Sequence, residues 1–302
     1  MRRRLVIYLV VTFGLTWGLW IPAGIATGSF AQGLGSSVLM VALTTLGMFC
    51  PLVGALAANA ACGRAERLDL GLRPQIEGHV RPYLAAWFLP TVVTLAGCVV
   101  FFAVYPQLFD PSASYFAEAA RASGYADGSQ VPLLLATQLV TAILIAPFIN
   151  MIPALGEEAG WRGMLFPTLC ERLSSRAAAL VVGAIWGLWH APITMMGHNF
   201  GMGYPGFPVL GILSMVVFCT SLSLCLSYLR MCTGSVWSCA LAHGALNGIA
   251  GVGVYFCLDG VILTGPSPAG IVAGIPLMAL AVLCWTRLAT IHNEGGSSRS
   301  HA

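Results

Sequence analysis

Three short polar clusters interrupt an otherwise apolar sequence and carry residue types suited to acid–base chemistry. They read Glu157-Glu158-Ala159-Gly160-Trp161-Arg162, Trp186-Gly187-Leu188-Trp189-His190 and His243-Gly244-Ala245-Leu246-Asn247. Carboxylates and imidazoles exchange protons near neutral pH, and imidazole and amide N–H groups can hydrogen-bond a developing oxyanion. The clusters are therefore the first place to look for a reactive site.

The spacing within each cluster indicates which side chains share a helix face. Glu158 and Arg162 are four residues apart, in the order that favours an ion pair on a helix. Glu157 is therefore not engaged by this pair. His243 and Asn247 are also four apart and project from one face of their helix. With His190 on a further helix, two carboxylates, two imidazoles and an amide can converge on one site.

The elements that must position these residues are membrane helices. The chain has 302 residues, of which 58% are hydrophobic and 8% are charged, and its mean hydropathy is +0.84. An ordinary soluble domain is roughly 25% charged. This composition excludes a soluble domain, a disordered chain, collagen and a coiled coil, and it gives no basic face for nucleic acid. The ten cysteines form no Cys-x-x-Cys pair and are expected to pack as small apolar residues.

The apolar stretches predict an all-α, polytopic membrane protein of about eight transmembrane helices. We expect one transmembrane domain over residues 1–292, followed by a polar tail at 293–302. The predicted spans are about 5–27, 35–62, 81–105, 131–154, 177–197, 208–229, 235–257 and 268–286.

The arginines predict the orientation of these spans. All 14 basic residues are arginine, and eight spans with a cytoplasmic N-terminus place 13 of them on the cytoplasmic side. Arg121 is the exception. The positive-inside rule therefore favours cytoplasmic N- and C-termini. Arginine without lysine, together with abundant Ala and Gly, suggests a bacterial chain, so we expect the bacterial inner membrane.

Depth along the helices sets a condition on the site. At about 1.5 Å of rise per residue, His243 lies roughly 12 Å and His190 about 20 Å from the inner ends of their predicted spans. Glu157 instead lies near the inner mouth. The three side chains can meet only if the fourth span continues through Glu157, or if the fifth span begins outside the hydrocarbon region of the membrane.

A purely structural role for these polar residues competes with the functional interpretation. A single Glu–Arg pair often finishes a helix at the interface, and a single His or Asn often bonds helix to helix. Ions inside a bilayer cost about 2.5–3.5 kcal/mol each on insertion scales, and three such groups together favour function. The other histidines, including His198, are expected to have no role. Trp161, Trp186 and Trp189 shape a substrate-pocket wall or pack in the core, and Gly187 allows close helix approach.

The three clusters, in this order, resemble the CAAX-protease and bacteriocin-processing (abortive-infection type) family of intramembrane endopeptidases. That family has the motifs Glu-Glu-x-x-x-Arg, Phe-x-x-x-His and His-x-x-x-Asn. The resemblance covers about residues 130–255, the expected protease core. One position departs from the pattern, because Trp186 stands where the family has Phe.

The resemblance implies a conical polar cavity open to the cytoplasm, and it implies roles. Glu157 and His190 would activate a water, His243 and Asn247 would form an oxyanion hole, and Glu158 with Arg162 would support the first carboxylate. The substrate would be a membrane-anchored or lipid-modified protein or peptide. No serine or cysteine nucleophile is needed for such hydrolysis. No His-Glu-x-x-His segment is present, so we favour no cofactor; if zinc is bound, its ligands would be Glu157, His190 and His243.

Two other functions remain open at the level of sequence. A membrane transporter could use buried Glu and His as a proton or ion relay, although we find no inverted repeat. A non-catalytic bacteriocin-immunity protein could use the same fold for binding.

Overall fold

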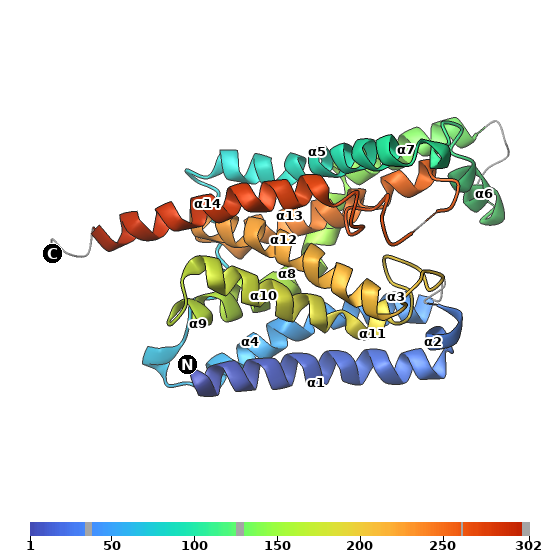
Figure 1. Cartoon of the computed structure of the whole chain (residues 1–302). Coiled ribbons are helices and arrows are strands. Elements are labelled where there is room, and N and C mark those ends of the chain that lie inside the picture. Colours follow the sequence, from blue (N-terminus) through green and yellow to red (C-terminus); the bar gives the residue numbers. More distant parts are fainter. Residues whose placement is uncertain (34–37, 125–129, 261, 298–302) are drawn as a thin grey trace.

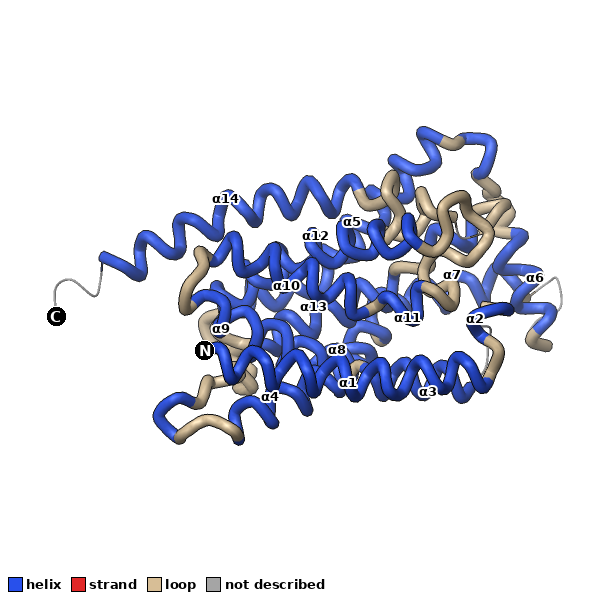
Figure 2. The backbone as a smooth tube through the Cα atoms, turned by 60° about the horizontal axis from the view of Figure 1, so that its bottom comes forward, coloured by secondary structure: helices blue, strands red, loops and turns tan. Residues whose placement is uncertain are grey.

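The computed structural model describes residues 1–33, 38–124, 130–260 and 262–297, with only the backbone for 289–297. Within these ranges the chain forms helices and loops and contains no strand (Figure 2). The prediction of an all-helical fold is confirmed. Residues 298–302 of the expected polar tail lie outside the described residues, and α14 continues into the tail as far as Ser297.

The helices follow one another along the chain with short connections. Their bounds are α1 (Arg2–Ala26), α2 (Ser29–Gln32), α3 (Val38–Gly47), α4 (Cys50–Ala60), α5 (Val80–Val104), α6 (Ser114–Ala122), α7 (Val131–Leu144), α8 (Ala146–Gly160), α9 (Phe166–Cys170), α10 (Ser175–Trp189), α11 (Ala191–Thr194), α12 (Val209–Thr233), α13 (Val236–Ile249) and α14 (Ile275–Ser297). Short 3-10 turns are η1 (Arg64–Glu66), η2 (Pro106–Leu108) and η4 (Val252–Phe256), and η3 (Trp161–Leu165) is a π-helical turn.

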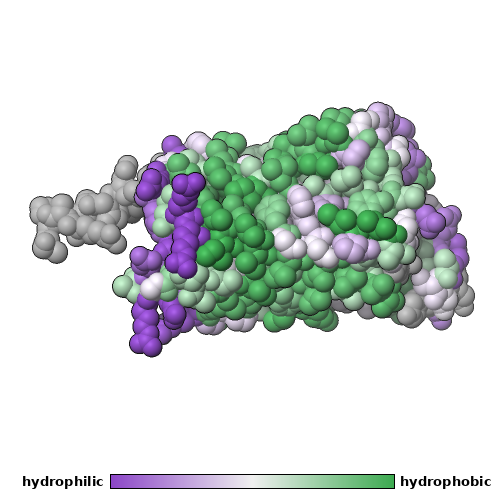
Figure 3. All heavy atoms as spheres, turned by 90° about the horizontal axis from the view of Figure 1, so that it is seen from below, coloured by the Kyte–Doolittle hydropathy of each residue, from purple (hydrophilic) through white to green (hydrophobic). Residues whose placement is uncertain are grey.

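Among the described residues, five helical segments are long and apolar enough to cross a membrane. They are α1, α3 with α4, α5, α12, and α13 with η4. A sixth consists of α7 followed by α8 and α9, bent by 47° between α7 and α8. Two shorter apolar helices, α10 and the first part of α14, occupy the places of the two remaining predicted spans. The polytopic membrane architecture is confirmed, and the count of eight stays a prediction. Figure 3 shows a broad apolar belt between two polar ends.

The helices run between two ends of the molecule (Figure 1). The first, here called the arginine end, is made by the N-terminus and the loops before α5, α10 and α13. Arg4 holds it together through hydrogen bonds to the Glu171 carboxylate and to the carbonyl oxygen of Glu66. Val236 N also donates to the Gly71 carbonyl oxygen over 3.0 Å.

The opposite end, here called the loop end, is made by the connections α1–α3, α5–α7, α10–α12 and α13–α14. Asp110 N donates to the Phe256 carbonyl oxygen over 2.9 Å, and Leu258 N donates to the Leu108 carbonyl oxygen over 3.0 Å. Both bonds join the α5–α7 connection to the α13–α14 connection.

Capping residues at the arginine end fix where two site-bearing helices begin. The Ser174 hydroxyl accepts a hydrogen bond from Ala177 N at the start of α10, and the Ser235 hydroxyl accepts one from Trp237 N at the start of α13. Gly234, with φ of 67°, ends α12 in the left-handed conformation that glycine adopts freely. These caps set the register that places His190 and His243.

The fourth span extends further than the sequence pattern predicts. The apolar pattern ends near residue 154, but α8 continues through Glu157 to Gly160, and helix persists through η3 and α9 to Cys170. The difference has a physical reason: the charges that end the apolar pattern are buried and partnered inside the bundle. Continuation of this helix through Glu157 is one of the two conditions under which the site was expected to close.

Two helix pairs approach so closely that only glycine fits at the crossing. A Cβ atom on Gly187 would lie 2.5 Å from Val216 Cα, at the contact of α10 with α12. One on Gly244 would lie 2.6 Å from Met151 N, where α13 meets α8. The predicted close approach at Gly187 is confirmed. The second contact places α13, which carries His243, against α8, which carries Glu157.

Candidate active site

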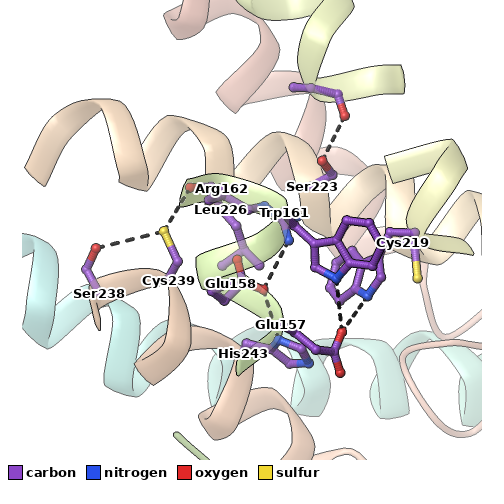
Figure 4. A network of polar contacts seen from close by, with 12 residues as sticks. Glu157, Glu158, Trp161, Arg162, Cys219, Ser223, Leu226, Ser238, Cys239 and His243 are labelled. Atoms are coloured by element: carbon purple, nitrogen blue, oxygen red, sulfur yellow. Dashed lines mark hydrogen bonds and ion pairs between the residues drawn. The ribbon is translucent and has the colours of Figure 1, made fainter. Parts of the chain in front are cut away.

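Glu157 projects from α8 into the bundle, and two indole groups hold its carboxylate. Trp186 Nε1 donates to Glu157 Oε2 over 2.6 Å, and Trp161 Nε1 donates to the same oxygen over 3.2 Å (Figure 4). The side chain is 2% exposed. Because both donors bind Oε2, they orient the carboxylate and leave Oε1 without a competing partner from either indole.

Glu158 forms a separate buried network with Arg162 and His243. Its Oε1 atom accepts hydrogen bonds from Arg162 Nη1 and from His243 Nδ1, each over 3.0 Å (Figure 4). The Arg162 guanidinium also lies 4.5 Å from the centre of the Trp186 ring, a cation–π contact. The predicted Glu158–Arg162 pair is confirmed, and it compensates charges that would be costly alone in the membrane.

His190 lies at the end of α10 with one ring nitrogen committed to the backbone. Its Nδ1 is 2.9 Å from the Trp186 carbonyl oxygen, and a carbonyl oxygen only accepts hydrogen bonds. Nδ1 therefore carries the proton. In the neutral ring this leaves the lone pair on Nε2, the atom that a base or a metal ligand would use.

A cavity of about 290 Å³ connects these groups. It brings together all four predicted catalytic residues, Glu157, His190, His243 and Asn247. Of the three predicted pocket tryptophans, Trp186 and Trp189 line the cavity. The other predicted residues lie behind its wall: Trp161, Glu158 and Arg162 are each 0% exposed.

Further residues line the cavity that sequence reasoning did not assign. His198, expected to have no role, lies in the lining with its ring stacked on that of His190, at 6.4 Å between centroids and 7° between planes. The first two predicted spans contribute through α1 and α3, and the α13–α14 connection forms part of the wall. These additional lining residues include Trp20, Thr44, Thr45, Met48, Asn199, Met215 and Ser267. Only the bare presence of a polar residue in a loop could have pointed to His198.

The cavity lies on the loop-end side of Glu157. Its loop residues, among them His198 and Ser267, come from the α11–α12 and α13–α14 connections, both of which belong to the loop end. No described residue of the arginine-end loops lines it. Two expectations therefore exclude each other in this structure: that the arginine end is cytoplasmic, and that the cavity opens to the cytoplasm.

A zinc ion would need its ligands grouped among the side chains that the structure describes. Among them, no group of three or more His, Cys, Asp or Glu side chains is arranged to hold a metal ion. Glu157, His190 and His243 share a cavity but do not form such a group. The residues present thus do not fit the conditional zinc set.

Comparison with known proteins shows what the segment that carries this site is similar to. Residues 136–249 match the family model described as Type II CAAX prenyl endopeptidase Rce1-like. The matched segment reaches from within α7 to the end of α13. All three polar clusters lie inside this segment, so the resemblance stated from the motifs is confirmed.

A curated protein shows a shorter likeness. The chain is 36% identical over 53 residues to CAAX prenyl protease 2 of Methanococcus maripaludis. The aligned segment covers 18% of this chain and 20% of that protein.

Proposed function

We propose that the protein is an intramembrane endopeptidase that hydrolyses a peptide bond of a membrane-bound or lipid-modified protein. The observation that carries the proposal is the convergence of Glu157, His190, His243 and Asn247 on one cavity. The likeness to CAAX prenyl endopeptidases supports the same reaction class. Carboxylate, imidazole and amide groups supply a base and oxyanion donors, which are the groups that water-mediated hydrolysis needs.

In the proposed reaction, Glu157 and His190 activate a water in the cavity. The water oxygen attacks the carbonyl carbon of the scissile bond while its proton passes to the Glu157 carboxylate or to His190 Nε2. The C–N bond of the tetrahedral intermediate then breaks, and the same proton is delivered to the leaving amine. The second proton of the water leaves the new carboxylic acid and protonates the amine, so that the products are a carboxylate and an ammonium group.

His243 and Asn247 would stabilise the negative oxygen of the intermediate. Asn247 is exposed to the cavity, so its amide is available to donate. His243 Nδ1 already donates to Glu158, so His243 can donate from Nε2 only as the doubly protonated ring. In that state one N–H binds Glu158 and the other faces the oxyanion.

Glu158 and Arg162 would act as positioning residues rather than reacting groups. Neither lines the cavity, and Glu158 orients the His243 ring through Nδ1. Arg162 balances the charge of Glu158 and packs on the Trp186 ring. The pair would thus hold both the oxyanion donor and the indole that orients Glu157.

The membrane supplies the setting for this reaction. We place the protein in the bacterial inner membrane, with the arginine end in the cytoplasm, on the evidence of its arginine distribution. A substrate anchored in the same bilayer would reach a site that lies within the apolar belt.

The test is a cleavage assay with the purified protein in lipid vesicles. One probe is a fluorescence-quenched peptide with a farnesylated cysteine, and the second is a quenched peptide anchored by an apolar transmembrane segment. Glu157→Gln and His190→Ala are compared with Glu118→Gln, which changes a carboxylate on α6 outside the cavity.

We expect the wild type and Glu118→Gln to cleave at least one probe. Glu157→Gln and His190→Ala should each lose about 10²–10⁴-fold in rate, the usual worth of a general acid–base group. Cleavage by Glu157→Gln at the wild-type rate would refute the glutamate mechanism. Cleavage by none of the folded proteins would favour the non-catalytic alternative.

A further inference from the structure

The cavity has a closed floor on the side of the arginine end. The π-helical turn that follows α8 fills this position, and Trp161, Met164 and Leu165 are each at most 1% exposed. A Cβ atom on Gly163 would lie 2.7 Å from the Leu70 carbonyl oxygen, so the turn is also packed directly against the loop before α5. Nothing as large as a peptide passes from the arginine end to Glu157 through this packing.

The opposite side of the cavity is lined by loop-end residues. Asn199 and Ser267 lie in its wall and are both only half-buried. They stand in the α11–α12 and α13–α14 connections, far along the chain from the arginine-end loops. Access from solvent therefore runs through the loop end.

The two ends differ strongly in charge. Among described side chains, the arginine end carries eleven arginines and four acidic residues, a net charge of +7. The arginines are Arg2, Arg3, Arg4, Arg64, Arg67, Arg73, Arg81, Arg172, Arg176, Arg230 and Arg287, and the acidic residues are Glu66, Asp69, Glu77 and Glu171. The loop end carries Arg121 against Asp110, Glu118 and Asp259, a net charge of −2.

An asymmetry of this size fixes the direction of insertion. Segments rich in Arg and Lys stay on the cytoplasmic side, and the rule is strongest for short loops close to the ends of spans. The arginine-end loops are short, and Arg64 to Arg81 all lie between α4 and the first turn of α5. The end that carries the cavity mouth must then face the other compartment.

We infer that the cavity opens to the extracytoplasmic side of the membrane, and that its substrate is a membrane-anchored polypeptide whose scissile bond lies on that side. The second part rests on the proposed function, whereas the first does not. A polypeptide lipidated and retained at the cytoplasmic face would not reach Glu157. A polypeptide translocated across the bilayer, but still anchored in it, would.

The direction of the mouth is tested by thiol labelling in intact cells. Single cysteines are introduced by Ser267→Cys in the cavity wall, Ser123→Cys beside α6 at the loop end, and Ser174→Cys at the arginine end. A membrane-impermeant maleimide carrying a mass tag is applied before and after permeabilisation. The wild type, with its ten native thiols, gives the background to be subtracted.

We expect Ser123→Cys and Ser267→Cys to be labelled equally before and after permeabilisation, and Ser174→Cys only afterwards. If Ser267→Cys reacts only in permeabilised cells, or in neither condition, the inference is overturned. Because labelling requires no catalysis, its outcome is independent of the cleavage assay.

The side of the membrane on which the substrate is cut is then tested with two transmembrane reporters, whose identical quenched segments lie on opposite sides of the bilayer. Only the reporter with an extracytoplasmic segment should be cut, and preferential cutting of the other would overturn this part.

Discussion

His243 Nδ1 lies 3.0 Å from Glu158 Oε1, although the two residues are 85 positions apart in the sequence. The same carboxylate oxygen binds Arg162, so one buried oxygen joins the second turn of α13 to the last turn of α8. The second carboxylate of the Glu-Glu pair is therefore a junction between helices, while the first faces the cavity.

The first prediction concerns this junction. Glu158→Gln removes a buried charge and leaves Arg162 uncompensated, which typically costs about 3–5 kcal/mol. We expect a clear fall in thermal unfolding temperature in detergent, accompanied by loss of cleavage. A Glu158→Gln/Arg162→Met double variant should regain part of the stability but not the activity. Equal stability of wild type and Glu158→Gln would mean that the ion pair contributes nothing.

A second prediction separates the two indoles that bind Glu157. Trp186→Phe restores the aromatic residue of the family motif and removes the 2.6 Å hydrogen bond, whereas Trp161→Phe removes only the 3.2 Å bond. Hydrogen bonds to charged groups contribute about 1.5–3 kcal/mol. We expect Trp186→Phe to reduce the cleavage rate about 10–100-fold, and Trp161→Phe to reduce it less. The reverse order would show that bond length does not report the importance of these donors.

A third prediction concerns the stacked histidines. His190 Nδ1 is fixed by the Trp186 carbonyl oxygen, whereas His198 reaches the cavity from the α11–α12 connection. His190→Ala should reduce the cleavage rate about 10²–10⁴-fold, as expected for a general acid–base group. His198→Ala should change the Michaelis constant more than the turnover number, because the ring borders the space where a substrate would lie. If both variants reduce turnover equally, His198 belongs to the reacting set.

A fourth prediction tests the crossing of α10 with α12. Gly187→Val adds side-chain atoms where even a Cβ would meet Val216, and overpacking of this kind costs about 1–3 kcal/mol. Gly18→Val on α1 is the matched control, since no atom lies within 4 Å of its added Cβ. Thermal unfolding in detergent should show a decrease for the first variant and little change for the second. Similar behaviour of both would contradict the close contact.

A fifth prediction uses an acidic residue outside the membrane spans. Hydrogen bonds from Ser112 and then Ser114 hold the pKa of the Asp110 carboxyl well below its ordinary value. Because the folded-state pKa is lowered, this stabilisation is present above an unfolded pKa of about 3.9 and is lost as pH falls below it.

Hydrogen exchange of the α5–α6 loop, corrected for the intrinsic effect of pH, measures this loss. Protection should fall as the solution is acidified below about pH 4. Asp110→Asn should show reduced protection at neutral pH and no further fall on acidification. An unchanged pH response in Asp110→Asn would assign the effect to another group.

Much of this architecture follows from local pattern, because apolar length and four-residue spacing act within single helices. The Glu158–Arg162 pair and the sharing of one face by His243 and Asn247 are of this kind. Local pattern does not carry the contacts made between helices. The bonds of Glu157 to two indoles, the bond of His243 to Glu158, and the place of His198 all depend on how helices cross.

The extent of the fourth span was missed for a related reason. Hydropathy counts Glu157, Glu158 and Arg162 as the end of an apolar stretch, whereas in the fold these charges are buried, and Glu158 and Arg162 neutralise each other. Motifs name the reacting groups without stating which side of them is filled. In the fold, Trp161, Met164 and Leu165 fill the side that faces the arginine end.

The packing around Trp161, Met164 and Leu165 also affects the proton permeability of the membrane. A hydrolase inside a membrane must hold water beside a buried carboxylate, and water continuous with both compartments would conduct protons down the electrochemical gradient. The packed π-helical turn between Glu157 and the arginine end interrupts any such continuous path of water. The cavity can therefore hold water while the membrane keeps its potential.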